Sequence, residues 1–120
     1  MVVTQRKNFH RNHPPKLIDV YVTFANAGET ERIVSVVIKE HLAACANYWP
    51  IRSQFHWKGK IVRDREIAVL FKTTTDRYAA LERRIKKLHS YTVPCIIAWA
   101  VTRSHPAYQR WVIASTDGPA

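Results

Sequence analysis

The fold is decided by residues Asn47–Thr73, NYWPIRSQFHWKGKIVRDREIAVLFKT. Large apolar residues alternate with mostly polar neighbours in the first half, the two-residue period of a half-buried strand, at Trp49, Ile51, Phe55 and Trp57. Lys58-Gly59-Lys60 then supplies a turn, and Ile61–Thr73 returns as a second strand. The stretch predicts a hairpin with arms 47–57 and 61–73, each about twice the usual strand length.

Each arm of the hairpin is joined to a strand and a helix. On the N-terminal side, Asn26 is placed to cap a helix with Glu29 three residues on, and apolar residues recur every four positions to Leu42. On the C-terminal side, spacings of three and four place Tyr78, Leu81, Ile85 and Leu88 on one helical stripe. The predicted elements are a strand at 17–24, a helix at about 27–41, the hairpin, a helix at 75–88, a strand at 91–101 and a short helix from Pro106.

This β-α-β-β-α-β order with a final helix predicts an α+β fold of the ferredoxin-like kind. In that arrangement two helices cover one face of an antiparallel sheet, the first and third strands are central, and the second and fourth are edges. The long hairpin then overhangs its own sheet with exposed aromatic residues. It either folds back on its own helices or contacts other subunits. We favour oligomerisation, because closed assembly also pairs exposed sheet edges.

The chain of 120 residues is long enough for one domain with its own core, expected over 17–115, with a short tail at 116–120. Residues 1–16 form a basic leader that carries four of the 19 Lys and Arg residues and no acid. The composition of this leader is typical of a disordered tail, or of an organelle-targeting or nucleic-acid-binding arm. The remaining chain is only moderately basic, so we expect no specific nucleic-acid partner.

The cellular setting follows from hydropathy and cysteine usage. No apolar run approaches the roughly 20 residues of a membrane-spanning helix, so no membrane association is expected. The two cysteines, Cys45 and Cys95, show no CxxC or zinc-finger spacing, which indicates a reducing compartment. We therefore expect a cytoplasmic protein.

Several function classes with this element order are not supported by the residues. The predicted third strand, IVRDREIAVLFKT, lacks the glycine-bearing aromatic run of an RNA-recognition module, and the first loop lacks the paired cysteines of a soft-metal chaperone. The chain has three glycines and no GxGxxG, P-loop or GxSxG motif. Asp64 and Glu66 point to one strand face, but Arg63, Arg65 and Lys72 nearby predict an ion-pair cluster. We predict that the protein is not an enzyme.

The order and spacing of six short motifs resemble the CutA family, named for divalent-cation tolerance. They are HLAACAN at 41–47, the W-x-G-x-I turn at 57–61, Glu66, FKT at 71–73, LHSYTVP at 88–94 and YQRW at 108–111. The resemblance covers about 17–115. It implies a ferredoxin-like subunit in a tight homotrimer, with hairpin arms embracing neighbouring subunits, and no catalysis. For function, the resemblance implies tolerance of divalent metals through metal binding, with copper as the main metal. The alternative that it implies is a metal-free signalling or scaffold trimer, which binds an effector or a protein partner between subunits.

The resemblance also selects candidate site residues. Metal ligands of copper-linked members are replaced here by Val22 and Leu88, which leaves His89, and an acid is replaced by Cys95. Cys45 either packs as a small apolar residue or joins a metal site with a partner such as His89. The candidate metal ligands for Cu(II) or another divalent cation are therefore His89 and Cys45. The candidate inter-subunit cleft, for metal or a small anion, comprises Trp57, Glu66, Lys72, His89 and Tyr91.

Each cleft residue also has a purely structural interpretation. Trp57 would pack within the hairpin, and Tyr91 would be an aromatic of the edge strand. Glu66 and Lys72 would form a salt bridge on one strand face, and His89 would cap the second helix.

Overall fold

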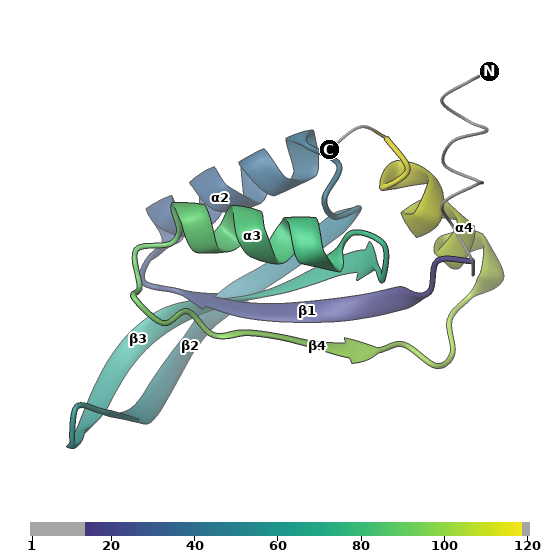
Figure 1. Cartoon of the computed structure of the whole chain (residues 1–120). Helices are drawn as coiled ribbons and strands as arrows, with labels where there is room; N and C mark the ends of the chain where they lie inside the picture. The colour runs from purple at the N-terminus through teal and green to yellow at the C-terminus, as the bar shows by residue number, and fades with distance from the viewer. Residues whose placement is uncertain (1–13, 119–120) are drawn as a thin grey trace.

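The computed structural model describes residues 14–118, so most of the predicted leader and the last two residues of the predicted tail lie outside it. The described chain has the predicted β-α-β-β-α-β order and final helix (Figure 1). Its elements are β1 (Leu17–Phe24), α2 (Ala27–Lys39), β2 (Cys45–Trp57), β3 (Lys60–Thr74), α3 (Tyr78–Leu88), β4 (Ile96–Ala100) and α4 (Pro106–Ser115). The predicted α+β class is confirmed.

The four strands form one antiparallel sheet in the order β2-β3-β1-β4, with β1 and β3 central as predicted. Helices α2 and α3 lie side by side on one face (Figure 1). Alternate residues of β1 point to these helices, and Val20, Val22 and Phe24 are fully buried there. The hydrophobic core lies between this face and the two helices.

The opposite face of the sheet, which we name the open face, lies away from α2 and α3. It carries the alternate positions, among them Tyr21 on β1 and Ile97 and Trp99 on β4. Ile97 is 54% exposed and Trp99 45%. Helix α4 contacts β1 and β3 at one end of the sheet (Figure 1). The open face therefore presents a large apolar surface in the isolated chain.

The hairpin overhangs the sheet, as the sequence predicts. Residues 67–74 of β3 pair with β1, whereas residues 60–66 pair only with β2. Lys58 and Gly59, with φ of 51° and 77°, form a two-residue turn of the left-handed kind that matches the twist of a hairpin. The described chain is elongated, at 54 × 28 × 25 Å.

Several element boundaries differ from the prediction, four of them as follows. β4 begins at Ile96 rather than Tyr91, because the backbone N–H groups of Ser90 and Tyr91 donate to side chains instead of to a strand. α3 begins at Tyr78 rather than Thr75, and α2 ends at Lys39, just before His41 takes a φ of 59°. β2 begins at Cys45 rather than Asn47.

The helices are tied together by charged side chains. Arg84 of α3 donates two hydrogen bonds, of 3.0 and 2.8 Å, to the Glu40 carboxylate after α2. Arg77 donates to the carbonyls of Thr116 and Gly118 after α4. These contacts hold the three helices in place relative to one another.

Candidate functional site

The hairpin and the segment 90–95 enclose a cleft of about 730 Å³ where the hairpin leaves the sheet. Apolar walls and polar groups meet in it. Its lining includes Thr23, Phe55, Trp57, Glu66, Tyr91 and Cys95. The cleft therefore combines side chains from β1, both hairpin strands and the loop before β4.

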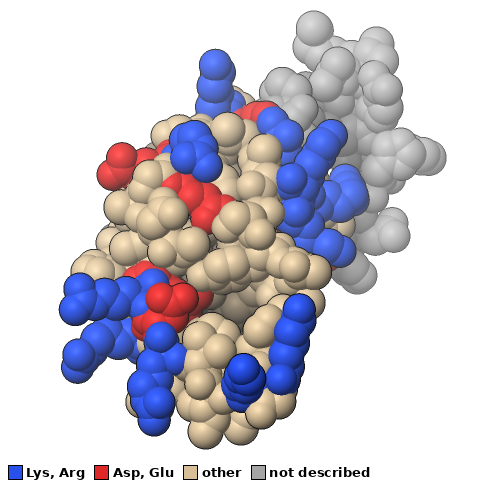
Figure 2. Space-filling model, turned by 90° about the vertical axis from the view of Figure 1, so that its left-hand side faces the viewer, with Lys and Arg blue, Asp and Glu red and all other residues tan. Residues whose placement is uncertain are grey.

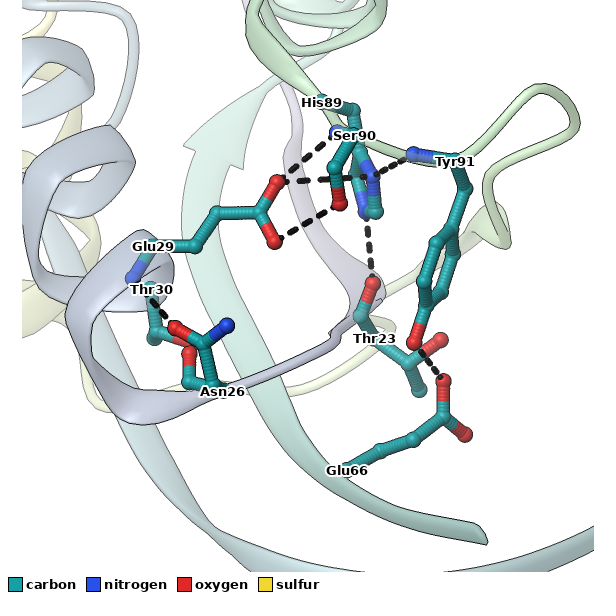
Figure 3. A network of polar contacts seen from close by, with 8 residues as sticks. All are labelled: Thr23, Asn26, Glu29, Thr30, Glu66, His89, Ser90 and Tyr91. Atoms are coloured by element: carbon teal, nitrogen blue, oxygen red, sulfur yellow. Dashed lines mark hydrogen bonds and ion pairs between the residues drawn. The ribbon is translucent and has the colours of Figure 1, made fainter.

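Glu66 is the central charged group of the cleft. It is only 7% exposed, and its carboxylate accepts a hydrogen bond of 2.7 Å from the Tyr91 hydroxyl (Figure 3). Burial, and then this hydrogen bond and the Glu66 charge, raise the pKa of Tyr91 above its ordinary value. Tyr91 is thus a hydroxyl donor that holds one oxygen of the carboxylate.

Two further polar groups share the cleft with Glu66. Burial first, and the Glu66 charge second, raise the pKa of the Cys95 thiol. Thr23 is 8% exposed, and its side chain lies beside the Tyr91–Glu66 hydrogen bond in Figure 3. No group in residues 14–118 hydrogen-bonds to the Thr23 hydroxyl. A buried hydroxyl without a partner inside the chain is rare and indicates a place for a ligand or water.

His89 lies behind this cleft with both ring nitrogens engaged. Nδ1 accepts a hydrogen bond of 3.0 Å from the Tyr91 backbone N–H, so Nε2 carries the proton and donates it to the Thr23 carbonyl at 2.7 Å. The ring also stacks on Phe24 with centroids 4.7 Å apart. In this arrangement no lone pair remains for a metal, and His89 acts by positioning Tyr91.

The Glu29 carboxylate completes the support for this loop. It accepts hydrogen bonds of 2.8 and 2.9 Å from the backbone N–H and hydroxyl of Ser90, and lies 3.9 Å from Nδ1 of His89. Asn26 caps α2 as predicted, accepting a 2.8 Å hydrogen bond from the backbone N–H of Glu29 (Figure 3). α2 therefore holds the loop that carries Tyr91 into the cleft.

Two predicted site residues lie elsewhere. Lys72 is six residues along β3 from Glu66, about 20 Å away at the rise of a strand. It pairs with Asp19 at 3.4 Å rather than with Glu66, so the salt bridge considered from the sequence does not form. Cys45 lies opposite Lys72, beside Tyr108 of α4, whose pKa is raised by burial first and by Cys45 second.

The predicted candidates therefore divide into two groups. The structure brings Trp57, Glu66 and Tyr91 together, with His89 directly behind Tyr91. It does not bring His89 and Cys45 together within one chain, because they lie toward opposite ends of the sheet. Within the described residues, no three His, Cys, Asp or Glu side chains are grouped so that they could hold a metal ion.

The predicted ion-pair cluster on β3 also needs correction. Asp64 and Glu66 line the cleft face, whereas Arg63 and Arg65 alternate onto the other face of the hairpin. The Asp64 carboxylate accepts from the backbone N–H of Arg65 at 2.8 Å, not from a guanidinium. Strand alternation separates the acids from the arginines.

Thr23 was not found from the sequence, and Cys95 was noted only as the replacement of a family acid, not as a cleft residue. The signal for Thr23 was its place at an alternate position of β1, facing away from the buried Val22 and Phe24. The place of Cys95 depends on the loop before β4, whose path is fixed by contacts with residues far apart in the sequence.

Comparisons with known proteins agree with the resemblance inferred from the motifs. The family model of the CutA1 divalent ion tolerance protein matches residues 18–115. The chain is 40% identical over 100 residues to the divalent-cation tolerance protein CutA of Pyrococcus horikoshii, covering 83% of this chain and 98% of that protein.

Solved structures give the same result for the fold. The periplasmic divalent cation tolerance protein CutA of Archaeoglobus fulgidus superposes with a TM-score of 0.82 at 35% identity, over 83% of this chain and 98% of that one. CutA of Xylella fastidiosa gives 0.83 at 32% identity, over 85% and 99%. This chain therefore belongs to the CutA1 family of divalent ion tolerance proteins.

Proposed function

We propose that this protein is a homotrimeric divalent-cation tolerance protein of ferredoxin-like subunits, which binds a divalent cation in the hairpin cleft and catalyses no reaction. Cu(II) is the first candidate for the cation. The proposal rests on one observation, that the buried Glu66 carboxylate, the Cys95 thiol and the Thr23 hydroxyl, which has no partner in the described part of the chain, share one cleft. The names of the relatives support a divalent cation as the ligand class.

The donor set of the cleft suits copper. A thiolate and a carboxylate are both metal ligands, and the thiolate favours softer cations, among which copper binds most tightly. Glu66 and Cys95 are two ligands from one chain, so a third comes from a neighbouring subunit or from solvent. Binding would release the Cys95 proton, so affinity should increase with pH.

The trimer is supported by the exposed apolar surface. Trp49, Phe55 and Trp57 of the hairpin and Trp99 of β4 are all exposed in the isolated chain, on the open face of the sheet. Such a surface is typical of an interface between subunits. In the proposed assembly each hairpin extends beside a neighbour and closes the cleft.

The cellular setting is also part of the proposal. Both cysteines are free thiols, and Cys45 and Cys95 lie at opposite edges of the sheet. Free thiols are typical of proteins in reducing compartments, so we propose the cytoplasm as the location. Among the described helices, none has the length and apolar character to cross a membrane.

A metal-free effector or scaffold trimer is the second candidate. The cleft volume of about 730 Å³ is that of a small-molecule site rather than of a single ion, and its walls include the rings of Phe55 and Trp57. Both nitrogens of His89 are also occupied by the chain itself. In this case the cleft would take an organic ligand or part of a protein partner.

Native mass spectrometry with Cu(II), under argon to exclude oxygen, separates these candidates. We expect a three-chain mass with one copper for each cleft, loss of copper in Glu66→Gln and Cys95→Ser, and retention in the matched control Cys45→Ser. A three-chain mass without copper would support the effector or scaffold function. Loss of copper in Cys45→Ser alone would restore Cys45 as the ligand, and a monomer would contradict the assembly.

A further inference from the structure

The face of the hairpin opposite the cleft carries three arginines, which we name the arginine cluster: Arg52, Arg63 and Arg65. Arg52 lies directly opposite Arg65 in the β2–β3 pairing, and Arg63 lies opposite Gln54, the next position on the same face. All three side chains are exposed, and Figure 2 shows Lys and Arg side chains projecting from the lower part of the molecule, where the hairpin lies. Like charges directly opposite one another in a sheet repel and destabilise the pair.

The arginine cluster is not neutralised by this chain. Asp64 is the neighbour in sequence, but its side chain lies on the cleft face and accepts from a backbone N–H. Among residues 14–118, none of the three guanidinium groups has a hydrogen bond or an ion pair. The repulsion between them is therefore uncompensated in the isolated subunit.

A second copy of the chain supplies few carboxylates for the cluster. The sequence has nine acidic residues, and all of them lie within the described part. Eight have a partner inside the chain, namely Asp19, Glu29, Glu40, Asp64, Glu66, Asp76, Glu82 and Asp117. Only Glu31 has no partner among residues 14–118, and the partners of Asp64, Glu66 and Glu82 are neutral groups. Since few carboxylates are without an existing contact, we favour a separate anion as the source of the neutralising charge.

The chemistry of the cluster fits phosphate. The planar guanidinium group of arginine donates two parallel hydrogen bonds to phosphate oxygens, and successive positions on one strand face are about 7 Å apart. A groove of about 460 Å³ adjoins Arg52 and Arg65 and extends to Ala25, at the end of β1. A chain of linked phosphates can therefore follow the strand and contact all three guanidinium groups.

The positions of the aromatic residues in the hairpin limit the class of ligand further. Phe55 and Trp57 lie on the cleft face, away from the arginine cluster. Tyr48 shares the face of the cluster but lies four positions along β2 from Arg52, about 13 Å away at the rise of a strand. Single-stranded nucleic acid is usually bound by basic groups with several aromatic rings that stack on its bases, and most of the exposed aromatic rings of the hairpin lie on the other face. The arrangement favours a ligand recognised mainly through its phosphates.

We propose that the arginine cluster binds a polyphosphate chain, either inorganic or the triphosphate of a nucleotide. The proposal is independent of the metal cleft, because the two sites lie on opposite faces of the hairpin. A bound polyphosphate would offset the repulsion between Arg52 and Arg65, so binding should also raise the melting temperature of the protein.

The test is calorimetric titration of the full chain with sodium tripolyphosphate, ATP and AMP at low ionic strength. The test variant is Arg52→Gln with Arg65→Gln. The control is Arg83→Gln with Lys87→Gln, which removes the same charge from two exposed residues of α3. We expect the hairpin variant to weaken tripolyphosphate binding by about tenfold or more and the control by less than about threefold.

The remaining outcomes are equally specific. AMP should bind about tenfold more weakly than ATP, because it presents a single phosphate. Equal affinities for tripolyphosphate and ATP would identify the phosphates as the whole ligand, and tighter ATP binding would identify a nucleotide; both support the proposal. No binding by the wild-type chain, or equal weakening in both double variants, would overturn it. A melting curve without ligand checks that both variants are folded.

Discussion

Glu66 and Cys95 affect each other across the cleft. Burial and the Glu66 charge both favour the neutral thiol, so the pKa of Cys95 is higher in the folded chain than in the unfolded one, where it is about 8.5. The folded state therefore has its full stability below the pKa of the unfolded chain, and it loses part of that stability as pH rises through the pKa of the folded chain. The thiol is therefore protonated and slow to react at neutral pH.

Replacing Glu66 tests this relation without disturbing the Tyr91 contact, since a glutamine oxygen can still accept the hydrogen bond. In Glu66→Gln the pKa of Cys95 should fall, and its alkylation by iodoacetamide at pH 8 should be about threefold faster or more. Cys45 in the same sample serves as the internal reference, measured by peptide mass spectrometry.

Asp64→Asn is the matched control for this experiment. Asp64 also lines the cleft, but it does not contribute to the pKa shift of Cys95. We expect its alkylation profile to match that of the wild-type protein. Equal acceleration at Cys45 and Cys95, or no change in Glu66→Gln, would show that the Glu66 charge does not control the thiol.

The hairpin turn determines whether the two long strands pair in register. Gly59 has a φ of 77°, and a Cβ added there would meet nothing within 4 Å. The cost of a substitution at this position therefore comes from the backbone conformation and not from a clash.

Two variants of Gly59 separate these effects. Gly59→Ala should lower the free energy of unfolding by about 1 kcal/mol, and Gly59→Asn by less, because asparagine tolerates the left-handed region. Urea denaturation followed by circular dichroism measures both. Equal losses for alanine and asparagine would contradict the assignment of the cost to φ.

The hairpin also shows how far sequence reasoning extends. Its alternation and turn residues lie within a few positions of one another, so the long arms and the central place of β3 were predictable. The path of the loop before β4 was not, because it depends on hydrogen bonds from Ser90 to Glu29, 61 residues apart, and from Tyr91 to Glu66. Nearness in sequence grouped Arg65 with Glu66, although a single step along a strand reverses the face.

At the scale of the whole molecule, the open face controls the proposed assembly. Ile97 lies near its exposed edge, opposite Tyr21 in the pairing of β4 with β1. A charge placed there would have to be buried, unpaired, in a subunit interface, which strongly opposes association.

Ile97→Glu should therefore shift the protein from a three-chain to a one-chain mass in size-exclusion chromatography with light scattering. The control is Ile38→Glu, at an exposed position of α2 on the other side of the sheet, which should leave the mass unchanged. Retention of the three-chain mass by Ile97→Glu would show that the open face is not the interface.

The pairing of β2 with β3 has a consequence for the order of folding. The paired residues of β2 and β3 are closer in sequence than those of any other strand pair in the sheet, because the turn at Lys58 and Gly59 joins the two strands. The partners of β1, by contrast, lie more than 40 residues away in sequence. Loop closure costs least for the hairpin, so we expect it to form first. The newly made chain then displays Trp49 and Trp57 before a partner covers them. The yield of folded protein after refolding should therefore fall as protein concentration rises, because exposed strand edges and aromatic residues of different chains can associate incorrectly.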